Sequence, residues 1–170
     1  MRTYFQPQET IVVLFGQTEF DSVWMDDPQT GEPRQAYGNI KQAKDDCEDM
    51  KALLLKFGVL EENIHMLENP KEAAVKKLYM TILKKLVAGR KMSPQKDYLI
   101  IHTFAGHGVQ DLGTQWLLLN EFDKSKQFYK MFGAENKLRM LAQEFPNSYQ
   151  IGIFACCRQR HDPPVCYPKG

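Results

Sequence analysis

The sequence predicts an α/β fold with a mainly parallel central sheet between two layers of helices, a three-layer sandwich. Short apolar runs rich in β-branched residues recur at residues 11–15, 63–67, 98–104 and 149–155. Amphipathic segments with helical spacing separate these runs, and strands that alternate with helices favour right-handed crossovers and parallel pairing. Helices on both faces would bury the continuously apolar strands that a parallel sheet contains.

The first strand and the first helix are separated by a long polar stretch. Residues 11–15 are an uninterrupted apolar run that ends at Gly16, as expected for a strand buried on both faces. Residues 17–38 then predict a loop, and loops of this length in compact domains are often functional. A helix is expected from Asn39, as its N-cap, to Gly58, which would end it. Its inward face would contain Ile40, Ala43, Cys47, Met50, Leu53, Leu54 and Phe57.

The second strand and the second helix follow directly. Residues 63–67 are expected to form the strand, and residues 74–86 an amphipathic helix with paired lysines on its outer face. The spacing of the apolar residues defines the inner face of this helix. That face would contain Val75, Leu78, Ile82, Leu83 and Leu86.

The last part of the chain is expected to complete the sheet. Residues 98–104 predict a third buried strand, and residues 113–120 a small hairpin arm. Residues 137–145 predict a third helix, and residues 149–155 a fourth core strand. Strands and helices therefore alternate along the whole chain.

Composition limits the classes of protein to consider. With 170 residues, 43% of them hydrophobic, the chain is expected to form one domain with one core. Its 22 basic and 21 acidic residues nearly balance, which argues against a nucleic-acid or anionic-membrane surface. No run of 18 apolar residues is present and residues 1–9 are polar and aromatic, so we expect neither a membrane span nor a secretory signal. The four cysteines do not form a disulfide framework, which favours the reducing cytoplasm.

Two motifs lie at the ends of predicted strands. His107 belongs to Phe-Ala-Gly-His-Gly at residues 104–108, and Cys157 to Ile-Phe-Ala-Cys-Cys-Arg-Gln at residues 153–159. Ligands of parallel sheets bind beyond the carboxyl ends of the strands. A thiol becomes a strong nucleophile beside an imidazole, and a glycine next to the histidine can expose an N–H to an oxyanion. We therefore expect Cys157 and His107 to form a nucleophilic site.

Together these motifs resemble those of the caspase-like cysteine peptidases, which include caspases, metacaspases and paracaspases. The caspase signature places the histidine about 50 residues before the cysteine, and here the two are 50 positions apart. The similarity extends from Ile11 to about Asp162 and includes Asp46 near the start of the first helix. The arginine-rich stretch after Cys157 looks most like the paracaspase version.

This resemblance implies that residues 1–170 form the large-subunit (p20) domain of a cysteine endopeptidase without its small subunit (p10), and that this domain is inactive in peptide cleavage without that partner. Cys157 would attack the peptide carbonyl, and His107 would protonate the leaving group. The N–H groups of Gly108 and Cys157 would bind the oxyanion. No cofactor or metal is implied, and the substrate would be a protein or peptide. A small subunit, or another chain, would pair with the open edge of the sheet.

The sequence departs from the family at the positions that select the substrate. Paracaspases and metacaspases have an aspartate two residues before the nucleophile and caspases a glutamine, whereas this chain has Ala155. Asp46 matches the other acidic position of paracaspases, which binds a basic P1 side chain. The resemblance therefore implies a substrate pocket at Asp46 and Ala155, with its P1 preference open.

Two other interpretations use the same residues. A catalytically silent pseudo-protease, kept as a regulatory or binding scaffold, would account for Ala155. A zinc-stabilised module would use Cys157, His161 and Cys166, with Cys156, although no C-x-x-C pair is present. Side chains alternate along a strand, so only one of Cys156 and Cys157 can face the cleft, and the resemblance assigns Cys157.

The remaining histidines and Cys47 are expected to be structural. His65 and His102 lie within predicted strands. Cys47 falls on the apolar face of the first helix, so we expect it in the core.

Overall fold

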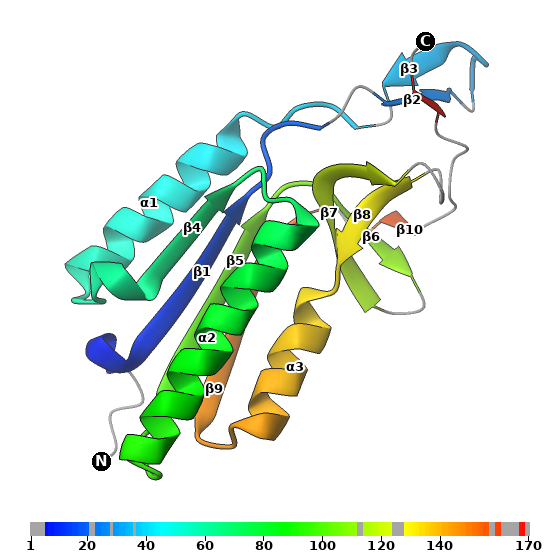
Figure 1. The fold of residues 1–170 in the computed structure, drawn as a ribbon. Coiled ribbons are helices and arrows are strands. Elements are labelled where there is room, and N and C mark those ends of the chain that lie inside the picture. The colour runs from blue at the N-terminus through cyan, green and yellow to red at the C-terminus, as the bar shows by residue number, and fades with distance from the viewer. Residues whose placement is uncertain are drawn as a thin grey trace.

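The computed structural model describes residues 6–20, 23–27, 29–35, 37–111, 114–123, 128–156, 159–160 and 167–168. A four-stranded sheet lies at its centre, in the order β4-β1-β5-β9, with every neighbouring pair parallel (Figure 1). Its strands are β1 (Thr10–Gly16), β4 (Ile64–Glu68), β5 (Tyr98–Ala105) and β9 (Ser148–Ala155). The predicted α/β fold and its four core strands are confirmed.

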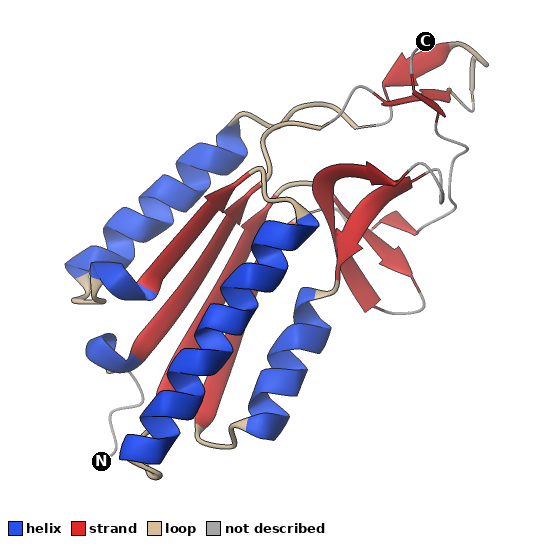
Figure 2. Ribbon diagram, viewed as in Figure 1, coloured by secondary structure: helices blue, strands red, loops and turns tan. Residues whose placement is uncertain are grey.

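Helices lie on both faces of this sheet, as Figure 2 shows. Helix α1 (Gln42–Lys56) covers one face, and α2 (Glu72–Met92) and α3 (Ala134–Glu144) cover the other. Short 3-10 turns, η1 (Pro7–Glu9) and η2 (Glu61–Asn63), precede β1 and β4. The three layers that the sequence predicts are therefore present.

Strand β1 joins two separate cores because its side chains alternate between the two faces. Its Ile11, Val13 and Phe15 belong to a cluster with buried residues of α2 and α3. Val12 and Leu14 belong to a second cluster, with residues of α1. All seven residues of β1 are buried, as expected for a central strand of a parallel sheet.

A second sheet extends beyond the carboxyl ends of the core strands. Its order is β10-β6-β7-β8, and all its pairs are antiparallel except β10 with β6. The strands are β6 (Gly108–Asp111), β7 (Thr114–Asp123), β8 (Phe128–Phe132) and β10 (Gln159–Arg160). The predicted hairpin arm at residues 113–120 is thus part of a larger sheet, which we call the arm.

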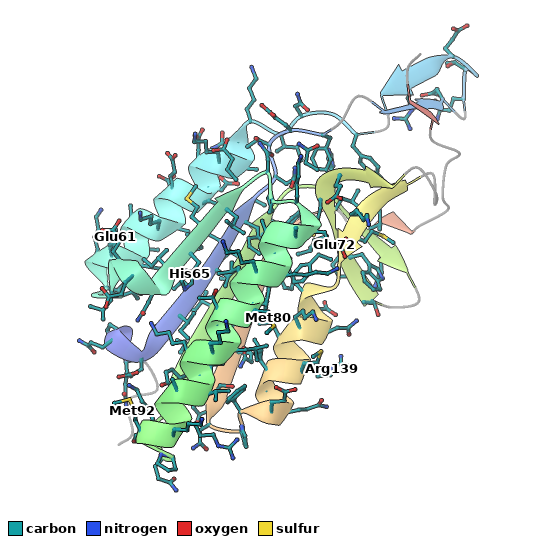
Figure 3. The ribbon with its side chains drawn as sticks, viewed as in Figure 1. Glu61, His65, Glu72, Met80, Met92 and Arg139 are labelled. Atoms are coloured by element: carbon teal, nitrogen blue, oxygen red, sulfur yellow. The ribbon has the colours of Figure 1, made fainter. Side chains whose placement is uncertain are left out.

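The arm is attached to the start of α2 through Glu72, which Figure 3 labels. The N–H of Glu72 donates to Oε2 of Glu121 at 3.1 Å, and the Glu72 carboxylate pairs with Lys130 at 3.1 Å. A carboxylate at a helix N-terminus is favourable because the helix dipole is positive there. The Glu121 carboxylate of β7 therefore replaces the side-chain cap that Lys71, the N-cap residue of α2, does not supply.

The stretch at residues 17–38 was expected to be a loop, but it contains a short hairpin. Strands β2 (Val23–Asp26) and β3 (Pro33–Gln35) pair antiparallel, and β11 (Tyr167–Pro168) pairs with β2. These strands are only four and three residues long, Val-Trp-Met-Asp and Pro-Arg-Gln, so neither is long enough to show the alternation that reveals a strand in a sequence.

The first helix differs from the prediction at its start and on its face. Helix α1 begins at Gln42 with Lys41 as N-cap, and Asn39 instead accepts the N–H of Phe20 at 3.1 Å. Leu53 and Phe57, predicted to face inward, are 47% and 60% exposed. The prediction is therefore wrong at these three positions, whereas Cys47 is buried in the core as expected.

Helix α2 is longer than the predicted 74–86 and buries one residue that apolar periodicity overlooked. Tyr79 is buried, while Leu78 and Leu83 are only partly buried. Among the helices of the described residues, none is both long and apolar enough to cross a membrane.

His102 of β5 is the most unusual residue of the core. Its ring is fully buried, and neither ring nitrogen has a hydrogen-bond partner among the described residues. Phe15, Phe132, Phe154 and Tyr79 surround it, with ring centroids 5.0 to 6.1 Å away. Burial lowers its pKa from 6.5 to about 3, so the folded protein holds a neutral imidazole there.

We predict that this burial makes the fold sensitive to acid. Because the folded-state pKa lies below the unfolded value, the stability contribution is complete above pH 6.5 and is lost as pH falls toward 3. Replacing His102 with Phe should reduce the loss between pH 6.5 and 4.5 by up to roughly 1.4 kcal/mol per pH unit. Urea unfolding at several pH values measures it, and equal slopes for the two proteins would contradict it.

Candidate active site

The histidine and cysteine motifs lie at neighbouring strand ends. Strands β5 and β9 pair in a register that places Ala105 beside Ala155. The N–H of Gly106 donates to the carbonyl of Ala155 at 3.2 Å. The segment that carries His107 is therefore hydrogen bonded directly to the strand that precedes the cysteines.

Cys157 itself lies outside the described residues, as do His161 and Cys166 of the zinc interpretation. The described residues before and after it lie beside the histidine motif. Sγ of Cys156 is 2.9 Å from the position that a Cβ atom at Gly108 would occupy, and Gln159 pairs with Val109. Within the described part of the chain, no group of three His, Cys, Asp or Glu side chains could hold a metal.

The two cysteines that the structure describes, Cys47 and Cys156, pack in or against the core. Cys156 packs, like Phe154, against the cluster formed with α2 and α3. Cys47 is 2% exposed, and burial, reinforced by the charges of Asp46 and Glu48, raises its pKa to about 11. A thiol with this pKa is protonated at neutral pH, so Cys47 is not a nucleophile.

The imidazole of His107 is held by the loop that follows β1. Its Nε2 lies 2.8 Å from the carbonyl oxygen of Gly38. Since a carbonyl only accepts, Nε2 carries the proton and donates, and Nδ1 has the lone pair of the neutral ring. The rings of Phe20 and Tyr37 lie 4.8 and 5.0 Å from the imidazole, measured between centroids.

This environment favours the neutral imidazole. Burial lowers the pKa of His107, and the hydrogen bond to the Gly38 carbonyl partly opposes this effect. At neutral pH, Nδ1 of His107 can therefore accept a proton. Once the ring is protonated, the carbonyl dipole of Gly38 stabilises the positive charge.

The backbone around His107 is anchored from three directions. Leu118 of the arm donates its N–H to the carbonyl of His107 at 3.0 Å. Gly106 bonds to β9, and the N–H of Gln17 donates to the carbonyl of Ala105 at 2.9 Å. The residue after β1, the end of β9 and strand β7 thus all constrain where the imidazole lies, which is the preorganisation that proton transfer requires.

Gly108 is required by close packing. A Cβ atom there would lie 2.6 Å from Nε2 of Gln115 and 2.9 Å from Sγ of Cys156. Real Cβ atoms do not approach other atoms so closely, so the strand after His107 and the end of β9 can meet only at a glycine.

The expected specificity residues are both exposed to solvent. The side chain of Asp46, in the first half of α1, makes no hydrogen bond or ion pair with the described residues. Ala155 ends β9 on the strand face of Ile151, the register partner of Ile101 in the α1-side core. Asp46 and Ala155 therefore belong to the same side of the sheet, and no interaction joins Asp46 to His107.

Sequence reasoning missed the residues that hold the imidazole. The stretch at residues 17–38 was expected to be functional. Its Phe20 and Tyr37 are aromatic residues in a mostly polar segment, and this pattern could have indicated that they pack against another part of the protein. The carbonyl of Gly38 is a backbone group, so its role cannot be predicted from the type of residue at that position.

No protein-family model matches this chain, and no curated protein is significantly similar to it. The function of the site is therefore inferred from residues and geometry.

We predict that a methyl group at residue 108 separates the two motifs. Gly108→Ala should destabilise the fold by about 1–3 kcal/mol, because Gln115 and Cys156 must both move. The matched control is Gly38→Ala, where a Cβ atom would meet nothing within 4 Å and the cost should stay within about 0.5 kcal/mol. Chemical denaturation measures both, and equal effects would refute the packing argument.

Proposed function

We propose that this chain is the catalytic domain of a caspase-like cysteine endopeptidase, with Cys157 as nucleophile and His107 as proton carrier. One observation carries the proposal. An imidazole oriented by a backbone carbonyl lies at the end of β5, beside the strand that leads into the cysteines. This combination has a clear use in acyl transfer and no evident use in a structural core.

The arrangement supports a two-step hydrolysis. Nδ1 of His107 takes the proton of the Cys157 thiol, the resulting thiolate attacks the peptide carbonyl carbon, and the N–H groups of Gly108 and Cys157 stabilise the oxyanion. His107 then donates the proton on Nδ1 to the leaving amine, which departs and leaves a thioester. Water attacks the thioester while His107 takes up its proton, and His107 then returns this proton to the departing Cys157 sulfur, so that the acid product leaves and the thiol is regenerated.

The position of Cys156 supports Cys157 as the nucleophile. Cys156 packs against the cluster of α2 and α3 and lies beside Gly108. A side chain in that place is not available to a substrate on the opposite side of the strand. Ala155, which precedes it, is exposed.

A catalytically silent scaffold is the second candidate, and Ala155 is the observation that favours it. An exposed alanine offers no charge or hydrogen bond to a substrate side chain, where related enzymes offer aspartate or glutamine. The retained environment of His107 favours the peptidase, because a scaffold has no need for an oriented imidazole.

We propose that a small-subunit-like segment or another chain covers β9. Among the strands of the described residues, β9 pairs only with β5, so its other edge has no strand beside it. On its α1 side, Tyr149, Ile151 and Ile153 are 44%, 45% and 46% exposed. An open edge beside exposed apolar side chains is a site for strand addition.

We also propose a reducing compartment, the cytoplasm, for this protein. A catalytic thiolate must stay reduced to act, and glutathione and thioredoxin keep thiols reduced there. Cys47 is a free thiol, which agrees with this environment.

Labelling with a peptidyl electrophile tests the nucleophile. We expect the adduct on Cys157, with labelling abolished in Cys157→Ala and largely intact in Cys156→Ala, because Cys156 is committed to the core. His107→Ala should slow the reaction of Cys157, since the imidazole no longer stabilises the thiolate. Peptide mass mapping identifies the modified residue. An adduct on Cys156 would overturn the assignment, and a Cys157 rate independent of His107 would favour the scaffold.

Electrophiles that differ at P1 test the pocket. We expect faster labelling with a basic than with an acidic P1 residue, because Asp46 remains as an exposed carboxylate. Ala155→Asp should increase the rate with P1 arginine by roughly 10- to 100-fold, since a charge-assisted hydrogen bond contributes about 1.5–3 kcal/mol. Strict preference for P1 aspartate would reject this pocket and move the protein toward true caspases.

A further inference from the structure

The loop after β1 reaches His107 from two sides, and both of its ends are fastened by asparagines. Phe20 comes from the start of the loop, and Tyr37 and Gly38 come from its end. Asn39 joins the two ends, since its Oδ1 accepts the N–H of Phe20 at 3.1 Å. The N–H of Ile40 also donates to the carbonyl of Thr18 at 2.8 Å.

Asn69, just after β4, holds the start of this loop. Its Oδ1 accepts the N–H of Thr18 at 2.8 Å and the N–H of Glu19 at 2.9 Å. Nε2 of Gln17 and the hydroxyl of Thr18 also lie within 3.1 and 3.2 Å of this oxygen. One amide oxygen therefore orders the three residues that precede Phe20.

The conformation of Asn69 is specialised for these bonds. Its φ of 47° lies in the left-handed region, which favours glycine and is tolerated by asparagine. Its own N–H donates to the carbonyl of Gly16 at 2.8 Å, and its Nδ2 donates to the Thr18 hydroxyl at 2.9 Å. Such strain persists where the surrounding structure requires it, and here it aims the amide at the loop after β1.

We propose that Asn69 is a positioning residue, which sets the place of the His107 imidazole through residues 17–20 and the ring of Phe20. This inference rests on the proposed peptidase function for its consequence, but its geometry does not. Asn69 does not touch the imidazole, and it acts on the wall against which the imidazole packs. If residues 17–20 move, the ring of Phe20 no longer packs against the imidazole, and the bond from Nε2 of His107 to the Gly38 carbonyl is held less firmly.

Asn69→Gly is the decisive variant, because glycine accepts the positive φ and removes only the amide. The matched control is Asn147→Gly, which removes a single bond from Nδ2 to the Pro94 carbonyl, next to the residue that begins β9. Asn69→Asp is the conservative variant, since a carboxylate oxygen can still accept the N–H groups of Thr18 and Glu19.

Nitrogen-15 NMR of the His107 ring reports its tautomer and pKa without any need for activity. In Asn69→Gly we expect the pKa of His107 to rise toward 6.5, because loss of burial, the larger cause of its lowering, outweighs loss of the carbonyl bond. The preference for a proton on Nε2 should weaken as well. Asn147→Gly should change neither, and Asn69→Asp should keep the Nε2 proton.

The same variants are then compared in the alkylation of Cys157 by a peptidyl electrophile. Asn69→Gly should slow it by about 10- to 100-fold, the cost of a misplacement of about 1 Å, with substantial recovery in Asn69→Asp. An unchanged His107 ring spectrum in Asn69→Gly would overturn the positioning role. If Cys157 does not react even in the parent protein, the peptidase proposal fails, while the ring spectra still decide the role of Asn69.

Discussion

The parallel pairing of β5 with β9 is the constraint on which the site depends. The two strands are joined through the arm and α3, and their register brings Ala105 beside Ala155. This pairing brings the segment that carries His107 beside the strand that leads to the cysteines, although the two motifs are far apart in sequence. A one-residue slip would turn every side chain of β9 to the other face. Phe154 and Cys156 would then leave the core formed with α2 and α3 and lie on the exposed side.

Burial of both faces of the sheet protects this register. Strand β1 places Ile11 and Phe15 in one core and Leu14 in the other. A shift of its register by one residue would exchange these side chains between the two cores and disrupt the packing of both. His102 is buried in β5, the strand that leads to the histidine motif, five residues before His107. Its ring nitrogens have no hydrogen-bond partner in the described part of the chain, and this costs stability because a buried polar atom without a partner loses its hydration. The core tolerates this cost through the aromatic rings around His102.

The strands were predictable because short, continuous apolar runs are typical of buried strands in parallel sheets. Once the strands were placed, the sequence put both motifs at strand ends. The failures have physical causes. Asn39 has the residue type of an N-cap, but its amide serves Phe20 on another segment, a tertiary contact that local pattern does not contain. Leu53 and Phe57 match the helical period yet lie exposed, because periodicity cannot reveal how much of a helix its sheet covers. The bond from His107 to the Gly38 carbonyl could not be predicted from residue types, because every residue has a backbone carbonyl.

The residues that we propose for chemistry and those that we propose for substrate selection occupy different parts of this fold. The imidazole depends on β5, on the loop after β1 and on Asn69, whereas Asp46 and Ala155 belong to α1 and to the last position of β9. No hydrogen bond or ion pair connects Asp46 to the described residues that hold His107. In the proposed peptidase, a change at Ala155 would therefore remove a specificity contact without disturbing the geometry around His107. For this reason an alanine at that position is weak support for lost catalysis, and the environment of His107 is the better guide to whether this site is active.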